Sequence, residues 1–328
     1  MRYKLLSYGA VLILMISLFG GAEGGCRCRG GGEDAWSGTS WLQDALGGPS
    51  SLAAEASAAE AGVANVSEEP IIPEEPIVVE ADELSSEDRS SWSISAEELR
   101  TRLDRGTKPV VAYVSNIPPE GSYIAGSIKL PSKSLITGDG SLRSAEDMAA
   151  VLGRAGVTED EGLVLYGDCF SCGDVTFVFW IMKYLGHRDV AVLRGYEKEW
   201  SAAGIPLSGA TSAKAEAVYT PDPRPGLMAD YGSVAGGVYQ VVDARTADQF
   251  RAGHIPGAVN IDYHRVMEGS WLKSDSALAR IFADLDEDKP VAVYTKNGGT
   301  ASIVWYALEL QGHDASLYTW NDWLDHRS

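Results

Sequence analysis

The chain has 328 residues, 45% of them hydrophobic, which is long and apolar enough for two packed domains of ordinary size. It carries 46 acidic and 27 basic residues, a net charge of −19, which argues against a nucleic-acid partner because phosphate binding needs a basic surface. The charge is uneven, since residues 1–90 contain 15 acidic and 5 basic residues. We therefore expect an acidic, solvated N-terminal section followed by a less acidic folded part.

The first 26 residues have the order of an export signal. Arg2 and Lys4 precede an apolar run from Leu5 to Phe19, and small residues follow. The run is shorter than the roughly 20 apolar residues of a transmembrane helix. A small-x-small cleavage site ends at Ala22, and Cys26 resembles the lipidated cysteine of bacterial lipoprotein signals. Residues 1–26 are therefore predicted to be an export signal or a membrane or lipid anchor, which places the protein in the periplasm or cell envelope.

Residues 27–90 have the composition of a linker. They are rich in Gly, Ala, Ser, Glu and Pro and show no sustained hydrophobic period. The stretch SEEPIIPEEPIVVEADELSSED contains nine carboxylates and no Lys or Arg, and charge repulsion together with its prolines favours an extended chain. We expect a disordered acidic tether between the export site and the folded part. A solvated tail without a partner is the alternative.

From residue 91 the hydrophobic pattern predicts alternating helices and strands. The first helix, 95–103, begins at a capping box of Ser95 and Glu98. Continuous apolar strands and one almost wholly apolar helix follow, which is typical of a parallel sheet covered on both faces. The expected elements are strands at 109–114, 162–167 and 189–195, a loop entering a strand at 123–131, the apolar helix 175–187 and the short helix 196–200.

The second half repeats the first. Tyr294 lies 128 residues after Tyr166, Gly312-His313 lies 126 residues after Gly186-His187, and HIPGA (254–258) lies 131 residues after YIAGS (123–127). Three landmarks within five residues of one period indicate a duplicated domain. The predicted fold class is therefore α/β, with one domain at 91–208, a connector at 209–222 and a second domain at 223–328.

The duplicated unit resembles the rhodanese family of sulfurtransferases in its two-domain form, over about residues 91–328. VVDARTADQFRAGHIPGAVNI in the second domain and LGHRDVAVLRGYEKEWSAAGIPL in the first carry the resemblance. It implies a mainly parallel five-stranded sheet with helices on both faces in each domain, a buried Asp243–Arg245 ion pair, and structural roles for His187, His254 and His313. It also implies a reaction without a cofactor, in which a Cys thiolate takes sulfane sulfur from a donor and passes it on through a persulfide.

The resemblance also implies where the nucleophile lies: first in a six-residue loop that ends, usually with Arg, at a helix N-terminus. The N–H groups of such a loop and the helix dipole lower the pKa of a thiol and bind an anionic donor. In the second domain Thr295 stands in place of the Cys and Thr300 in place of the Arg. A Thr hydroxyl has no thiolate-like state at neutral pH, so we expect a catalytically silent loop that at most binds an oxyanion. Its residues are Thr295, Lys296, Asn297, Gly298, Gly299 and Thr300.

In the first domain the loop counted back from the helix is CFSCGD, with Cys169 first and Asp174 in place of the Arg. Counted forward from Tyr166, Cys169 comes two residues late. We predict Cys169 as the nucleophile and Cys172 as its resolving partner, and we expect Asp174 to raise the pKa of a neighbouring thiol and to repel thiosulfate. The rest of the expected anion- or substrate-binding loop is Phe170, Ser171, Gly173, Asp174 and Val175.

Four interpretations of Cys169 and Cys172 remain open. The pair is a persulfide nucleophile with its resolving thiol, a dithiol redox centre, half of a metal site, or a structural disulfide in an oxidising compartment. A metal site needs two more soft ligands, and the other cysteines, Cys26 and Cys28, lie in the signal or tether. We therefore expect no metal site.

The sequence thus predicts an exported tandem rhodanese-like protein that transfers sulfur or a related chalcogen, or carries out thiol redox chemistry, at Cys169 with help from Cys172. The rival hypothesis is a catalytically silent binding or assembly module of an exported redox system. The expected partners are a small sulfur-containing anion or persulfide donor, an exported redox protein, and a membrane through the N-terminus. Neither a nucleic acid nor a cofactor is expected.

Overall fold

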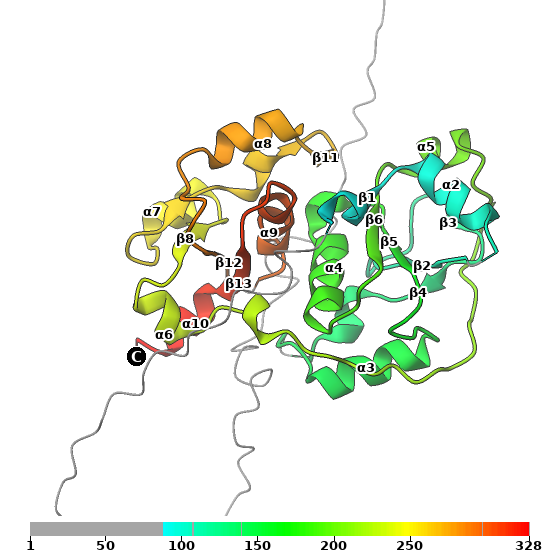
Figure 1. Ribbon diagram of the computed structural model, residues 1–328, viewed down its shortest axis with the longest axis horizontal. Helices are drawn as coiled ribbons and strands as arrows, with labels where there is room; N and C mark the ends of the chain where they lie inside the picture. Colours follow the sequence, from blue (N-terminus) through cyan, green and yellow to red (C-terminus); the bar gives the residue numbers. More distant parts are fainter. Residues whose placement is uncertain (1–87, 107, 139, 297, 328) are drawn as a thin grey trace, which may run out of the picture.

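The computed structural model describes residues 88–327 except 107, 139 and 297. It contains two α/β halves that lie side by side, each built on a parallel sheet (Figure 1). The expected export signal, Cys26 and nearly all of the expected linker lie outside the described residues. Among the residues that are described, no helix is long and apolar enough to cross a membrane. The domain boundaries stay predictions, and the 3₁₀ helix η3 (Arg89–Trp92) spans the residue where we expect the linker to end.

The sheet of the first half has five strands, all parallel, in the order β1-β6-β5-β2-β4. Its central strands β2, β5 and β6 are buried along their whole length, as their continuous apolar sequences predict. A separate antiparallel ribbon joins β3 to β7. The bounds are β1 Ser93–Ile94, β2 Val110–Tyr113, β3 Tyr123–Ile124, β4 Ile128–Lys129, β5 Leu163–Tyr166, β6 Val190–Leu193 and β7 Leu207–Ser208.

Helices cover both faces of this sheet. One face packs against Leu99 of α2 and Trp200 of α5, and the other packs against Met148 of α3 and the apolar residues of α4. Helix α2 begins at the predicted capping box, in which Glu98 N donates to Ser95 Oγ and Ser95 N donates to Glu98 Oε2. The bounds are α2 Ala96–Asp104, η4 Ser132–Leu135, α3 Ala145–Arg154, η5 Phe170–Cys172, α4 Asp174–Tyr184 and α5 Glu197–Ala202.

The sheet of the second half has four parallel strands, in the order β13-β12-β8-β9. Five were expected, but at the fifth position the chain meets the sheet only at the parallel bridge Met228–Leu317. Pro225 begins a 3₁₀ turn before this bridge and Asp230 caps α6 after it, which leaves too few residues for a strand. The bounds are η6 Pro225–Leu227, α6 Tyr231–Ala235, β8 Gln240–Asp243, α7 Ala247–Ala252, β9 Val259–Asn260, η7 Tyr263–Val266, β10 Met267–Glu268, β11 Trp271–Leu272, α8 Asp275–Phe282, β12 Val291–Thr295, α9 Ala301–Leu310, β13 Ala315–Thr319 and α10 Trp320–Asp325.

The repeat in the sequence corresponds to a repeat in the structure. Tyr166 Oη accepts a hydrogen bond from Ile124 N at 3.0 Å, and Tyr294 Oη accepts the equivalent bond from Ile255 N at 3.2 Å. The matching strands also have the same neighbours, β6-β5-β2-β4 in one half and β13-β12-β8-β9 in the other. The predicted duplication is therefore confirmed.

The two halves share one hydrophobic core. Helices α4 and α9 pack against each other between the two sheets (Figure 1), and every residue of α4 is buried. Near the N-terminal ends of these helices the hydroxyls of Thr176 and Ser302 lie 2.7 Å apart. Trp92 of η3 fills the junction, with its ring centroid 5.0 Å from that of Phe179 and 6.0 Å from that of Trp305. The long apolar helix of each half is thus covered partly by the other half.

Candidate active site

The cysteine pair lies in the loop between β5 and α4, at the carboxyl end of the first sheet. Strand β5 ends at Tyr166, residues 167–173 form the loop, and α4 begins at Asp174. Loops and helix N-termini converge at the carboxyl ends of parallel strands, which is where open α/β proteins bind ligands. Cys169 is 8% exposed, whereas Cys172 is more accessible. The predicted position of the pair, between a strand and the apolar helix, is confirmed.

Cys169 and Cys172 form a disulfide that closes this loop, with their Cα atoms 5.4 Å apart. The turn η5 brings them together, and Gly173 ends it at φ +81°, a conformation that favours glycine. Cys169 Sγ also lies 3.5 Å from Ser171 Oγ. Sulfurs bonded to each other hold no metal ion, and within the described chain no group of three or more His, Cys, Asp or Glu residues could hold one. The three other interpretations of the pair all include a disulfide and stay open.

Asp174, which stands where the family has Arg, is buried at the first position of α4. Its Oδ1 accepts hydrogen bonds from Ser132 Oγ at 2.6 Å and from Asn116 Nδ2 at 2.9 Å. Burial raises the pKa of this carboxyl to about 6, although the hydrogen bonds from Ser132 and Asn116 and the charge of Lys133 lower it. The segments that follow β2 and β4 therefore hold the start of α4 through a single carboxylate.

Phe170, between the two cysteines, packs against the second half. Its ring centroid lies 4.1 Å from that of Trp271 in β11 and 6.5 Å from that of Tyr306 in α9. Close by, Tyr196 Oη donates to Ser270 O at 2.9 Å, in the turn between β10 and β11. The β10–β11 hairpin of the second half therefore lies against the cysteine loop of the first.

The cysteine loop also meets the Thr295–Thr300 loop. A β-carbon on Gly173 would come within 2.9 Å of Gly299 O and 3.4 Å of Thr300 Cα, so the two backbones are in direct contact. Thr176 Oγ1 donates to Gly173 O, and Ser302 Oγ donates to Gly299 O, at 3.2 and 2.7 Å. The two loops that resemblance assigns to sulfur chemistry thus face each other across the junction of the two halves.

The Thr295–Thr300 loop has a threonine hydroxyl at the position that the resemblance assigns to the nucleophile. Thr295 is fully buried at the end of β12, and its Oγ1 accepts a hydrogen bond from Gly298 N at 3.2 Å. A loop amide is therefore directed at a hydroxyl, which cannot form a persulfide. Lys296 is exposed, and Asn297 lies outside the described residues.

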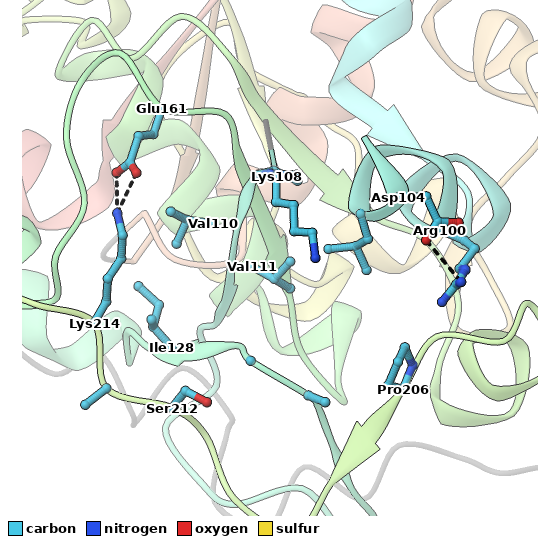
Figure 2. Close-up of a pocket in the computed structure, with 15 residues that line it drawn as sticks. Arg100, Asp104, Lys108, Val110, Val111, Ile128, Glu161, Pro206, Ser212 and Lys214 are labelled. Carbon is cyan, nitrogen blue, oxygen red and sulfur yellow. Dashed lines mark hydrogen bonds and ion pairs between the residues drawn. The ribbon is translucent and has the colours of Figure 1, made fainter. Parts of the chain in front are cut away.

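A different hollow lies at the amino end of the first sheet (Figure 2). It has a volume of about 450 Å³ and an apolar floor from β2 and β4. Ion pairs flank it, Lys214 with Glu161 at 2.5 Å and Arg100 with Asp104 at 3.0 Å. Its lining contains neither Cys nor His, so it offers no nucleophile for sulfur transfer.

Comparison with known proteins assigns the family. The sequence model of the rhodanese-like domain matches residues 231–325. Thiosulfate sulfurtransferase of Gallus gallus is 31% identical over 207 residues, which cover 57% of this chain and 71% of that protein. The chain belongs to the rhodanese family.

Solved structures show that both halves of this rhodanese share a known tandem fold. SseA from Escherichia coli, described as a 3-mercaptopyruvate sulfotransferase, is 23% identical with a TM-score of 0.61 and covers 70% of this chain and 98% of its own. Tum1 from Saccharomyces cerevisiae is 18% identical with a TM-score of 0.62, and the match covers 71% of this chain and 94% of Tum1. At these identities the two structures establish the fold alone, and the chemistry has to be inferred from the residues of this chain.

The ion pair implied by the rhodanese resemblance is present in the second half. Arg245 Nη2 lies 2.6 Å from Asp243 Oδ2, and both side chains are buried. Tyr294 Oη also donates to Asp243 at 2.6 Å. Burial alone would lower the pKa of Arg245, but the hydrogen bonds and the charge of Asp243 outweigh it and raise the pKa. The pair joins β8, β12 and the chain before α7, and it lies outside the cysteine loop.

The three histidines have the structural surroundings that the resemblance implies. His187 is buried, with Nε2 3.0 Å from Glu161 O, and burial lowers its pKa. The Nδ1 atom of His254 lies 3.0 Å from a carbonyl oxygen of α7, and His313 packs edge-on to Phe282.

Sequence reasoning missed three residues next to the pair: Asn116, Ser132 and Trp271. Asn116 follows directly after Tyr113-Val114-Ser115, which stands where the second half has Asp243-Ala-Arg, so the departure of this segment from the repeat was a usable signal. Ser132 and Trp271 belong to no motif, and only the fold brings them to the loop.

Proposed function

We propose that this rhodanese transfers sulfur, or exchanges thiols with a partner, through Cys169 and Cys172. The observation that supports it most is the disulfide between them, in the loop where a rhodanese unit holds its nucleophile. That loop lies at the carboxyl end of β5 and against the second half. Once the pair is reduced, Cys169 supplies the thiolate that takes up sulfane sulfur, and Cys172 supplies the thiol that resolves the persulfide.

The reaction starts from the reduced pair. The Cys169 thiolate attacks the outer sulfur of a donor such as thiosulfate or a persulfide; the donor's sulfur–sulfur bond breaks, and the remnant leaves with the electron pair. Cys169 then carries a persulfide. The Cys172 thiolate attacks Cys169 Sγ, the persulfide bond breaks, hydrosulfide leaves, and the disulfide forms. Exchange with a dithiol of an exported redox partner reduces the pair again.

Mass spectrometry tests this reaction. After the reduced protein is incubated with thiosulfate or a small persulfide, we expect about 32 Da, one sulfur, on the peptide that contains Cys169. Cys172→Ser should increase this adduct because nothing resolves the persulfide, and Cys169→Ser should abolish it. If no donor adds sulfur and dithiothreitol leaves the disulfide closed, the proposal is wrong.

The rival function is a catalytically silent module that binds an anion or a partner within an exported redox system. The buried hydroxyl of Thr295, bonded to Gly298 N, favours this function for the second half. Alkylation of reduced Cys169 at mildly acidic pH separates the two functions. Rapid labelling requires a lowered thiol pKa and supports catalysis, whereas labelling as slow as that of an unperturbed thiol favours the module.

We also propose that the N-terminal segment exports the protein and anchors it in the cell envelope through a lipid on Cys26. The order of basic, apolar and small residues supports this. We expect incorporation of labelled fatty acid that Cys26→Ala abolishes and the matched Cys28→Ala retains. Full-length, unmodified protein in the cytosolic fraction would contradict export.

A further inference from the structure

The start of α4 is fixed by a compact polar cluster beneath the cysteine loop. Asp174 Oδ1 accepts from Ser132 Oγ and Asn116 Nδ2, and the same Asn116 Nδ2 donates to Ser132 Oγ at 2.8 Å. Asn116 Oδ1 accepts from Lys133 N at 2.9 Å. Ser132 N in turn donates to Val114 O, at the end of β2, at 2.9 Å. The first sheet thus holds the residue that follows the cysteine loop and begins α4.

Asp174 also lies close to the cysteine pair along the chain. Asp174 follows Cys172 by two residues, which keeps their Cα atoms within about 7 Å of each other. Gly173 N donates to Phe170 O at 3.0 Å, so Cys172 lies in a tight turn that leads directly into Asp174. A negative charge near a thiol opposes its ionisation.

The groups around Asp174 are few within the described chain. Lys133, on η4, is exposed and attracts the carboxylate, and Asp168, on the other side of the pair, repels it. Asp168 also accepts from Tyr113 Oη at 3.1 Å, which holds it at the edge of the loop. Asp174 is the buried acid of the two, so its charge is screened least by water.

We propose that Asp174 is the positioning residue of the Cys169–Cys172 pair: it fixes the end of the loop through Ser132 and Asn116, and its charge sets how thiol reactivity changes with pH. The inference rests on the proposed thiol chemistry. When Asp174 gains a proton, the charge beside the sulfur disappears and the thiol ionises more readily. When Asp174 loses it, the thiol pKa rises and the fraction of thiolate falls.

The sign of the effect can be followed with pH. Below about pH 5 the carboxyl is protonated, so wild type and Asp174→Asn have the same charge and the same thiol reactivity. Above about pH 7 only the wild type has the negative charge, and Asp174→Asn should react about three- to tenfold faster. Well above the thiol pKa both thiols are ionised and the rates converge again. A loss of structure alone would change the rates by a factor that does not depend on pH.

The experiment measures the rate of iodoacetamide alkylation of Cys169 across this pH range, in a Cys172→Ser background, by peptide mass spectrometry. Asn at position 174 keeps an oxygen that accepts from Ser132 and Asn116, so we expect the fold to be retained. Ser132→Ala provides a second variant that keeps the carboxylate. The hydrogen bond from Ser132 lowers the pKa of Asp174, so its removal should raise that pKa. The alkylation rates of Ser132→Ala and of the double variant Ser132→Ala/Asp174→Asn should therefore begin to differ at a higher pH than those of the wild type and Asp174→Asn.

Asp147→Asn is the matched control, because Asp147 is an exposed acid in the first turn of α3. We expect its rates to equal those of the wild type at every pH. The inference is overturned if the ratio of the Asp174→Asn rate to the wild-type rate does not change with pH. It is also overturned if Asp147→Asn gives the same pH-dependent ratio as Asp174→Asn. Either result leaves the proposed function intact. Failure of the proposed function is different: no sulfur adduct and no opening by a dithiol, whatever the residue at position 174.

Discussion

Arg245→Ala is expected to lower the free energy of unfolding by about 3–5 kcal/mol, because it leaves the buried carboxylate of Asp243 without its cation. Asp243 is fully buried, and within the described part of the chain its carboxylate keeps the hydroxyl of Tyr294 and the backbone N–H of residue 245 as donors. The guanidinium also lies 4.4 Å from the ring centroid of Trp320, and that contact is lost as well. Unfolding in urea, followed by circular dichroism, measures the change.

Arg251→Ala supplies the matched control for this prediction. Arg251 pairs with Asp248 on the exposed surface of α7, where an ion pair contributes at most about 1 kcal/mol. We expect its midpoint to stay close to that of the wild type. A loss below about 1 kcal/mol for Arg245→Ala would show that the buried pair does not hold the second half together.

Trp92→Ala is expected to cost about 3–5 kcal/mol, the usual effect of removing a large buried aromatic side chain. Trp92 is 1% exposed, and its ring contacts Phe179 of α4 and Trp305 of α9. Lys183 Nζ lies 4.8 Å from the ring centroid, so the variant also removes the aromatic face from a buried ammonium. Hydrogen exchange should increase in both α4 and α9, because the ring touches both helices.

Trp92→Phe tests whether the loss of stability in Trp92→Ala comes from lost aromatic packing at the junction rather than from a disturbed η3. It keeps an aromatic ring and should cost less than half as much as Trp92→Ala. Faster exchange confined to the first half in Trp92→Ala would contradict the shared core.

Much of the fold was predictable because local signals and the repeat agreed. The Ser95–Glu98 capping box needs only two residues three positions apart, and it starts α2 as expected. The equivalence of Tyr166 and Tyr294 came from an offset in the sequence and reappears as equivalent hydrogen bonds. For the fifth strand of the second sheet the signals disagreed. The resemblance implied this strand, whereas Pro225 and Asp230 leave room only for a bridge.

The site was predictable in position but not in state. Spacing places Cys169 and Cys172 in one loop, but whether their sulfurs meet depends on the turn at Gly173, whose φ no pattern fixes. The environment of Asp174 depends on Ser132 and Asn116, which lie 42 and 58 residues away along the chain. Contacts of this kind come from the packing of three loops at one sheet edge, and a single sequence contains no local signal for them.

The contact between Thr176 and Ser302 has a consequence for how the protein is built. These residues are 126 positions apart, the same offset that relates the ends of α4 and α9, so each is the counterpart of the other in its own repeat. Side chains that meet their own counterparts are what the axis of a symmetric dimer produces. The chain therefore has the geometry of two subunits joined end to end. Under the proposed function, such a fusion frees one copy of the loop from keeping a nucleophile, because the cysteine loop of the other copy supplies it.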